Sequence, residues 1–410
     1  MKPLSDRVNS FTDSVIRRMT RISDACGAIN LSQGFPDFDP PRELMDALAK
    51  AAYAGPHQYS VTYGAPNLRE ALAQKHSRIV GRPIDPESQV LVTCGGTEAM
   101  MAVMMSICNP GDKVLVFSPF YENYGADAIL SGAQPIYIPL VPPDYGFDLA
   151  LIEQGFQQGA KAIIICNPSN PCGKVFTREE LLAIGALAEK YDAYIVTDEV
   201  YEYLVYEPHI HTCMASLPGM FERTVTCNSL SKTYSITGWR LGYVIGPDEV
   251  VEMAKKVHDF LTVGAPAPLQ EAAVIGLHFD DSYYERLRAL YTDKRAYFLR
   301  GLDRIGLKHN VPQGTYFVLI DIRDFLDLPR FRGWTDLEFC EWMAREIGVA
   351  AVPGSSFFKE DVNNLIRLHF AREQATMDEA LRRLAKLCAL LDKGCRAPYN
   401  ESSTSTRRLP

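Results

Sequence analysis

The chain has 410 residues, of which 47% are hydrophobic and 22% are charged, so it can bury the cores of roughly two or three domain-sized units. Its 42 Lys and Arg residues are outnumbered by 50 Asp and Glu residues, which gives a formal net charge of -8. This acidic balance, without a block of basic residues, argues against nucleic acid and against an anionic membrane surface as partners.

The N-terminal stretch, residues 1–21, is polar and contains no apolar segment typical of a signal peptide. No apolar run approaches the roughly 18–20 residues that a membrane-spanning helix needs. Ten cysteines are scattered between Cys26 and Cys395, with no C-x-x-C pair and no histidine at zinc-ligand spacing. We therefore expect a cytoplasmic protein with free thiols, no metal centre and no membrane segment.

The middle of the chain alternates short apolar runs with helical stretches. Thr177 and Glu180 have the spacing of a capping box, which predicts a helix that ends near Tyr191. Apolar strands that alternate with helices predict an α/β fold with a mostly parallel sheet covered on both faces. In such sheets ligands bind beyond the carboxyl ends of the strands. The expected strands are residues 90–93, 114–117, 162–166, 194–196, 225–227 and 243–245.

After about Pro268 the pattern changes, and a helical stretch over about 272–300 leads into more widely spaced strands. Thr335 and Glu338 form a second capping box, which predicts the start of a helix between these strands. This arrangement favours a smaller α+β domain. Residues 396–410 are rich in Ser and Thr and lack apolar anchors, which predicts a disordered tail. The expected strands here are residues 316–320, 349–352 and 366–370.

Lys232 lies just beyond the expected strand 225–227, in the segment that runs from Ser229 to Arg240. A lysine amine in such a place can form a Schiff base with a carbonyl cofactor. Ser229 and Arg240 are natural phosphate ligands, because arginine offers a fixed cationic fork and serine a short donor. A single lysine is more often an ordinary surface residue, so this prediction depends on the whole segment.

Asp198 follows the expected strand 194–196, where a buried carboxylate is costly unless it is paired. It is a helix cap, a member of a structural ion pair, or the partner of a pyridinium nitrogen that it keeps protonated. Tyr201, three residues later, lies on the same side and can donate to a ring phenolate. Asn170 can donate to the same oxygen, although its Asn-Pro-Cys-Gly turn also explains an asparagine.

Three further positions can bind a ligand. Gly96 and Thr97 open a helix after the strand 90–93, where exposed N–H groups form an anion site, although Thr97 can also be a plain helix cap. The G-x-G-x-x-G dinucleotide fingerprint is absent. Tyr121 can stack on a planar ring or belong to the core. Arg367 lies within an apolar strand and needs a carboxylate, either from a ligand or from a structural salt bridge.

Taken in chain order, these residues resemble the fold-type I pyridoxal 5′-phosphate (PLP) enzymes, specifically the class I and II aminotransferases that include the aspartate, aromatic and kynurenine enzymes. The resemblance extends over about residues 16–391 and adds Gly34, near the substrate carboxylate, and Tyr59, which would reach the phosphate of the neighbouring subunit's cofactor. Cys172 and His369 depart from the family pattern. The implied cofactor-binding residues are Tyr59, Gly96, Thr97, Tyr121, Asn170, Asp198, Tyr201, Ser229, Lys232 and Arg240, and the implied substrate-binding residues are Gly34, Asn170 and Arg367.

The same resemblance implies an N-terminal arm over residues 1–45 that also forms part of the small domain, a large PLP-binding domain over 46–280, a small C-terminal domain over 281–392 and a disordered tail over 393–410. It implies a homodimer with shared active sites, acting on amino-acid and 2-oxo-acid substrates. Lys232, Asp198 and Tyr201 are the implied catalytic residues, with Lys232 as the general base that moves the Cα proton during transamination.

Two alternatives remain open from the sequence. A PLP-dependent lyase or cyclase would use the same residues for elimination or cyclisation. A ligand-sensing domain of a transcription regulator would need a DNA-binding module, for which the segment before Gly34 leaves no room. The sequence does not name the amino-acid side chain that is accepted.

Overall fold

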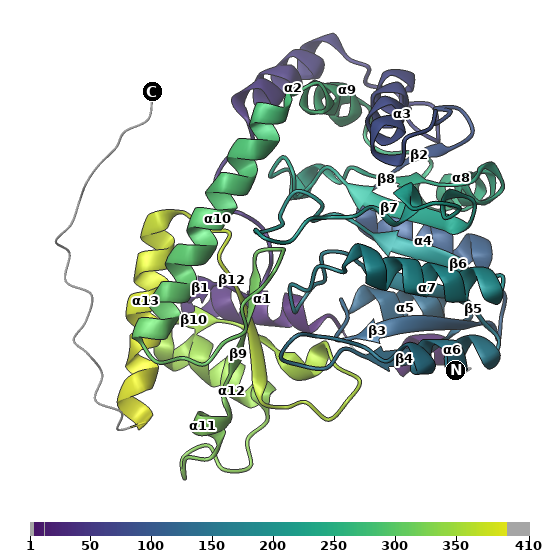
Figure 1. The fold of residues 1–410 in the computed structure, drawn as a ribbon. Coiled ribbons are helices and arrows are strands. Elements are labelled where there is room, and N and C mark those ends of the chain that lie inside the picture. Colours follow the sequence, from purple (N-terminus) through teal and green to yellow (C-terminus); the bar gives the residue numbers. More distant parts are fainter. Residues whose placement is uncertain (1–3, 12, 392–410) are drawn as a thin grey trace.

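The computed structural model describes residues 4–11 and 13–391. Its main element is a seven-stranded sheet in the order β2-β8-β7-β6-β5-β3-β4 (Figure 1). Within it only β8 runs antiparallel to its neighbours, so the prediction of a mostly parallel sheet is confirmed. The strands are β2 (Val90–Thr93), β3 (Lys113–Ser118), β4 (Gln134–Pro139), β5 (Ala160–Cys166), β6 (Tyr194–Asp198), β7 (Thr224–Ser229) and β8 (Gly242–Ile245).

Both faces of this sheet are covered. The strands are apolar along most of their length, so their side chains, which point alternately to the two faces, form a core on each face. Val114 and Val116 of β3 point into one core cluster, whereas Leu115 and Phe117 point into another. Burial of each such side chain contributes about 1.5–3 kcal/mol. Helices α4 (Gly96–Ile107), α5 (Asn123–Leu130) and α8 (Asp248–Thr262) supply the first cluster, and α6 (Leu149–Gln157) and α7 (Arg178–Lys190) supply the second. Helices α2 (Arg42–Ala54), α3 (Pro66–Val80) and α9 (Ala267–Leu277) pack beyond β2 and β8.

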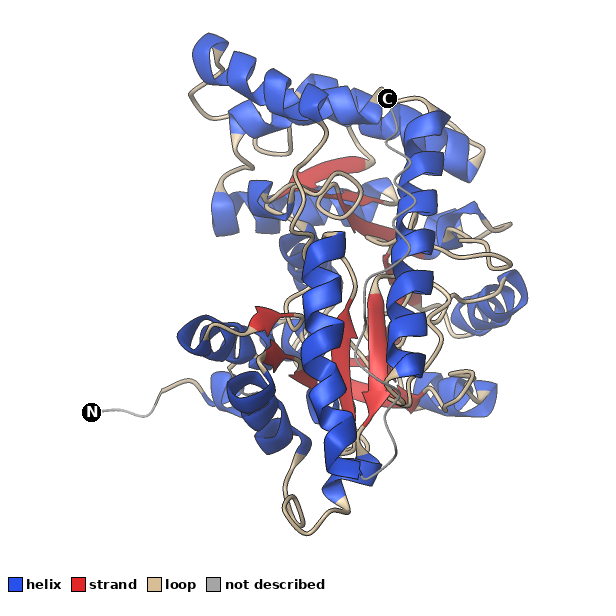
Figure 2. Cartoon of the chain, turned by 90° about the vertical axis from the view of Figure 1, so that its left-hand side faces the viewer, coloured by secondary structure: helices blue, strands red, loops and turns tan. Residues whose placement is uncertain are grey.

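A further core joins the N-terminal segment to the C-terminal part of the chain, and Figure 2 views the molecule from this side. An antiparallel three-stranded sheet, β11-β12-β9, lies at its centre, and a short parallel pair, β1 with β10, lies beside it. The strands are β1 (Ile29–Asn30), β9 (Phe317–Asp321), β10 (Val349–Ala350), β11 (Val352–Pro353) and β12 (Leu365–His369). The helices are α1 (Val15–Cys26), α10 (Asp281–Arg304), α11 (Arg323–Leu326), α12 (Asp336–Trp342) and α13 (Gln374–Cys388). Short 3₁₀ helices lie at Asp6–Ser10, Met214–Ser216, Phe221–Arg223, Thr237–Trp239, Gly354–Ser356 and Ala389–Leu391, and Met343–Ile347 forms a π-helical turn.

Both predicted capping boxes are confirmed, at Thr177 and at Thr335. The prediction of one helix over about 272–300 is wrong. Helix α9 ends at Leu277 and α10 begins at Asp281, because the side chain of Asp280 accepts the N–H of Ser282 and caps a new helix. The strand expected over 349–352 is two strands, β10 and β11, which belong to different sheets.

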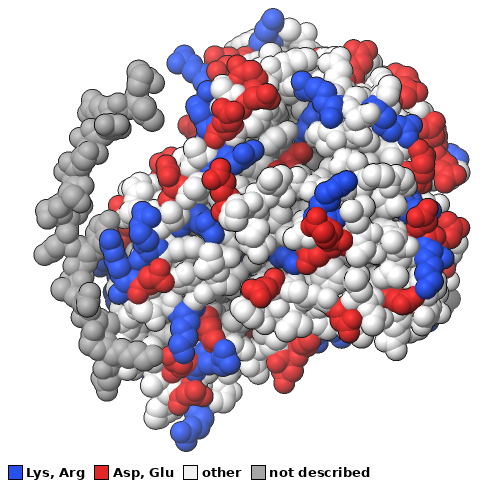
Figure 3. Space-filling model, viewed as in Figure 1, with Lys and Arg blue, Asp and Glu red and all other residues white. Residues whose placement is uncertain are grey.

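The domain limits at 46–280 and 281–392 stay a prediction, and the tail over 393–410 lies outside the described residues. None of the described helices is both long and apolar enough to cross a membrane. Figure 3 shows basic and acidic side chains interspersed over one face of the molecule, with no large patch of a single sign on that face.

Candidate active site

The polar residues singled out in the sequence gather where the strands of the large sheet end. Asp198 is the last residue of β6 and Ser229 the last residue of β7, and these two strands are parallel neighbours. Asn170 lies in the turn that follows β5, and Gly96 begins α4 directly after β2. The carboxyl edge of the sheet is therefore the place where these side chains meet.

An anion-binding cradle lies at the N-terminus of α4. A Cβ added at Gly95, whose φ is +88°, would lie 2.3 Å from Nη2 of Arg240, so the guanidinium lies directly against the loop. The side chain of Ser229 approaches Gly96 from β7. Arg240 donates only to the backbone oxygens of Thr237 and Cys94, at 3.0 and 3.4 Å, and no carboxylate of the described residues pairs with it. A helix N-terminus and a cation without a counter-charge favour a phosphate-sized anion.

Thr97, on the first turn of α4, is exposed beside this cradle. The alternative that Thr97 is a plain N-cap is wrong, since the cap position is Gly95 and no side chain caps α4.

Tyr124 of α5 forms a hydrogen bond with Asp198. Tyr124 Oη donates to Asp198 Oδ2 at 2.6 Å, and the N–H of Val200 donates to Oδ1 at 3.3 Å. Burial raises the pKa of Asp198, and these hydrogen bonds partly oppose the rise. Within the described residues no helix begins at Asp198 and no basic side chain forms an ion pair with it, so neither structural alternative accounts for this carboxylate.

Lys232 extends toward the N-terminal segment. Its Nζ donates to the backbone oxygen of Gly34 at 2.9 Å, and Tyr316 Oη donates to the same oxygen at 2.8 Å. Nζ also lies 5.9 Å from the centre of the buried Tyr201 ring. Burial raises the pKa of Tyr201, so its hydroxyl stays a neutral donor. Gly34 has to be a glycine, because an added Cβ would lie 2.5 Å from the ring of Phe317.

Arg367, on β12, is 1% exposed and lies between the rings of Phe317 and Phe357, at 4.1 and 4.6 Å from their centres. Nη1 donates to Asn170 Oδ1 at 2.7 Å and Nη2 to the backbone oxygen of Ser32 at 2.8 Å, while Nε has no partner. Burial lowers its pKa to about 10, so the side chain stays charged at neutral pH. The alternative of a structural salt bridge is not found among the described residues, so the charge is available to a ligand carboxylate.

The remaining predicted residues differ in their surroundings. Tyr121 is half-buried against Tyr124, with ring centres 5.8 Å apart, and burial raises its pKa to about 12. Tyr59 is 86% exposed in the single chain. Cys172 is buried in the turn after β5, and His369 is buried two residues beyond Arg367 on the same strand.

Sequence reasoning missed the contacts that orient the site. Tyr124 supports Asp198, Tyr316 shares the Gly34 oxygen with Lys232, and Ser32 binds Arg367. A tyrosine in an apolar segment looks like a core residue, and a backbone oxygen leaves no sequence signal. These partners lie far along the chain, so only the tertiary fold reveals them.

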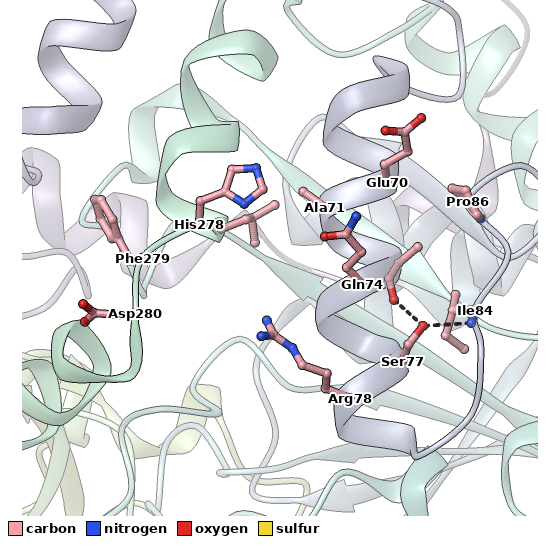
Figure 4. Close-up of a pocket in the computed structure, with 12 residues that line it drawn as sticks. Glu70, Ala71, Gln74, Ser77, Arg78, Ile84, Pro86, His278, Phe279 and Asp280 are labelled. Atoms are coloured by element: carbon pink, nitrogen blue, oxygen red, sulfur yellow. Dashed lines mark hydrogen bonds between the residues drawn. The ribbon is translucent and has the colours of Figure 1, made fainter.

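A separate hollow of about 760 Å³ lies between α3 and the junction of α9 with α10 (Figure 4). Ser77 there donates to the backbone of Ala73 and accepts from Ile84, and charges of both signs, Arg78 and Asp280 among them, surround it. None of the predicted site residues lines this hollow.

Comparison with known proteins identifies the fold and the activity. The family model described as aminotransferase class I and II matches residues 27–384. Probable N-succinyldiaminopimelate aminotransferase DapC of Mycobacterium tuberculosis is 36% identical over 394 residues, which cover 93% of this chain and 98% of that protein. Human kynurenine–oxoglutarate transaminase 1 is 34% identical over 387 residues, covering 87% and 92%.

Solved structures agree with the sequence relatives. N-succinyldiaminopimelate aminotransferase from Mycobacterium tuberculosis superimposes with a TM-score of 0.88 at 35% identity, covering 94% of this chain and 100% of that one. YbdL from Escherichia coli, described with a methionine aminotransferase function, gives 0.87 at 33% identity over 94% and 100%. The predicted fold-type I architecture, PLP cofactor and transamination are thereby confirmed, in preference to a lyase. The chain belongs to the class I and II aminotransferases.

Proposed function

We propose that this aminotransferase holds PLP on Lys232 and binds the α-carboxylate of an amino acid with Arg367. The observation that carries the proposal is the setting of Lys232, whose amine bonds only to a backbone oxygen and forms no ion pair within the described residues. An amine without a carboxylate partner is available to an aldehyde. The charge of Lys232 acts on the carboxyl group of Asp198, and Nζ lies 5.9 Å from the centre of the Tyr201 ring.

The residues of the site fit this cofactor. The cradle of Gly96, Thr97, Ser229 and Arg240 suits a phosphate, because it combines helix N–H groups with an unpaired guanidinium. The carboxylate of Asp198, oriented by Tyr124, suits a protonated ring nitrogen. When bound, the cofactor supplies an electron-accepting ring for the charge that develops at the substrate Cα.

Three further side chains suit the ring of the cofactor. Asn170 accepts from Arg367 through Oδ1, so its NH₂ group can donate to the ring oxygen. Tyr201 can donate to the same oxygen, and Tyr121 can stack on the ring face. One asparagine would then link the cofactor ring to the carboxylate clamp, because Asn170 already bonds to Arg367.

Proton transfer falls to Lys232. Its amine takes the proton from the substrate Cα, and Arg367 fixes the carboxylate so that this proton faces Nζ. When the amine of Lys232 is free, as in this structure, Nζ donates a hydrogen bond to the oxygen of Gly34, which orients the amine.

Two finer features complete the proposal. A homodimer would cover the exposed rings of Tyr53, Tyr59 and Phe260, which are 93%, 86% and 92% exposed in the single chain. In it Tyr59 would bind the phosphate in the partner subunit. A reducing compartment, the cytoplasm, suits the free thiols of Cys94, Cys166 and Cys172. Light scattering of the purified protein should give the mass of two chains, and a monomer would remove this part of the proposal.

Reductive labelling tests the role of Lys232. Borohydride should fix the cofactor to the peptide that contains Lys232, and Lys232→Ala should abolish both the label and turnover. Lys190→Ala, at an exposed ion pair on α7, is the matched control and should keep both. A label on another peptide, or full turnover by Lys232→Ala, would contradict the proposal.

A further inference from the structure

We infer that Glu98 and His258 form a positioning pair that couples the phosphate cradle of each subunit to the loop which that subunit sends to its partner's active site. The inference rests on the proposed function in one respect, the exchange of Tyr59 between subunits. Its evidence is a continuous series of hydrogen bonds between α4, α8 and the segment after Tyr59.

Glu98, in the first turn of α4, binds the cradle with one oxygen and α8 with the other. Oε2 accepts the N–H of Cys94, which precedes the two glycines of the cradle. Oε1 accepts Thr262 Oγ1 at 2.8 Å and faces His258 Nδ1 at 2.7 Å. The backbone oxygen of Cys94 in turn accepts Nη2 of Arg240. One buried carboxylate therefore holds the loop that also binds the phosphate-site arginine.

His258 connects this carboxylate to the loop between α2 and α3. The side chain is 0% exposed, and Nε2 lies 2.8 Å from the backbone oxygen of Thr62, three residues after Tyr59. A carbonyl oxygen can only accept, so Nε2 carries a hydrogen and the imidazole donates to Thr62. The other nitrogen, Nδ1, forms the 2.7 Å hydrogen bond with Oε1 of Glu98.

The link is charge-assisted. Burial alone would raise the pKa of Glu98, but the hydrogen bonds from His258 and from the N–H of Cys94 overcome it and lower that pKa. Hydrogen bonds with an ionised partner are about twice as strong as neutral ones. The segment around Thr62 is also docked on β2, since the N–H of Val92 donates to the oxygen of Tyr63 at 3.0 Å. Movement of the cradle is thereby transmitted to the base of the Tyr59 loop.

If Glu98 and His258 were only a structural ion pair, different results would be expected. Its loss would loosen the site for every ligand, and only within the same subunit. A positioning pair acts on phosphate binding, both in its own subunit and in the partner. These two properties define the tests.

The first test compares two aldehydes on the apo-enzyme, PLP and pyridoxal, which lacks the phosphate. His258→Gln keeps a polar side chain but cannot donate to Thr62 and bond to Glu98 in the same geometry. We expect PLP affinity to fall at least about tenfold and pyridoxal affinity to change less than about twofold, measured by absorbance titration. His278→Gln, an exposed histidine beside α9, is the matched control and should change neither. An equal loss for both aldehydes would overturn the inference.

The second test uses hybrid dimers with a single working site. One subunit is wild-type, and the other carries Lys232→Ala, so that turnover reports only the wild-type subunit's site. Adding His258→Gln to the Lys232→Ala subunit leaves every residue of the working chain unchanged. We expect the PLP concentration for half-maximal activity to rise about threefold or more, because the altered subunit supplies Tyr59. No change would overturn the inference.

A third hybrid separates this result from the proposed function. Tyr59→Phe, placed in the Lys232→Ala subunit, should also weaken PLP binding at the working site. If Tyr59→Phe has this effect and His258→Gln has none, the coupling fails while the shared site stands. If neither has an effect, the exchange of Tyr59 itself is wrong, and the inference falls with it.

Discussion

Nη1 of Arg367 donates a hydrogen bond of 2.7 Å to Oδ1 of Asn170, 197 residues earlier in the chain. The bond joins β12 of the small sheet to the turn after β5 of the large sheet. The side chains proposed for the substrate carboxylate and for the cofactor ring are therefore bonded directly to each other. In the proposed site, a substrate carboxylate bound by Arg367 would lie beside the asparagine that contacts the ring.

Arg367→Lys should weaken amino-acid binding strongly while PLP binding stays near normal. Lysine is a point charge and cannot hold Asn170, Ser32 and a carboxylate with one planar fork. Loss of charged hydrogen bonds costs about 1.5–3 kcal/mol, or about 10–100-fold in kcat/KM. Arg300→Lys, at an exposed position on α10, should leave kcat/KM unchanged. The role of Arg367 is refuted if amines without a carboxylate react as well as amino acids in the wild type.

Asp198→Asn should keep the fold but slow removal of the Cα proton by about two orders of magnitude or more, because groups that stabilise developing charge are each worth on the order of 3 kcal/mol. Tyr124→Phe should give a smaller loss, since it removes one of the hydrogen bonds that orient Asp198. Single-turnover kinetics with Cα-deuterated substrate measure this step. Tyr191→Phe, which loses a hydrogen bond to surface Glu153, is the control. A loss below about tenfold for Asp198→Asn would assign it a structural role.

Much of the site could be predicted because polar residues interrupt apolar strands. Asp198 and Ser229 end such strands, and Arg367 is a charge inside one, so each needs a partner. The strand β4 could not be predicted in this way. Its sequence contains Pro135 and Pro139, which usually argue against a strand, but β4 is the edge of the sheet, where a missing N–H costs little.

The contacts that complete the site depend on tertiary structure. Tyr124 lies 74 residues from Asp198, and nothing in the sequence of α5 distinguishes it from a core tyrosine. The boundary between α9 and α10 was missed for a local reason. Helical residues flank a short interruption, and the cap formed by Asp280 outweighs the tendency of the helix to continue.

Gly34→Ala should lower kcat/KM at least about tenfold without loss of secondary structure. The added methyl group would lie 2.5 Å from Phe317, so the ring or the backbone has to shift, and a shift of the backbone moves the oxygen that accepts hydrogen bonds from Lys232 and Tyr316. Gly146→Ala is the matched control, because its Cβ would meet no atom within 4 Å. Steady-state kinetics with circular dichroism check the pair of variants. Equal activity of the two variants would mean that the Gly34 oxygen does not position Lys232.

Asp127, on α5, is 2% exposed, and its Oδ2 has no hydrogen-bond partner. Burial, and then the charge of Asp198, raise the pKa of Asp127 well above its usual value. Between the unfolded pKa of about 3.9 and the higher folded pKa, the native state binds more protons than the unfolded state. Stability therefore falls as pH rises through this window, by up to about 1.4 kcal/mol per pH unit.

Asp127→Asn removes this titration. The midpoint temperature of its unfolding should therefore rise relative to that of the wild type as pH increases from about 4 toward 8. Asp127→Leu should show the same trend, because it also lacks the carboxyl group but carries no amide that needs a partner. Thermal unfolding of all three proteins across this pH range measures the difference between variant and wild type, in which the other titrating groups largely cancel. A difference that stays constant with pH would show that the pKa of Asp127 is the same in the native and unfolded states, and a wild type whose stability rises relative to both variants with pH would reverse the sign of the shift.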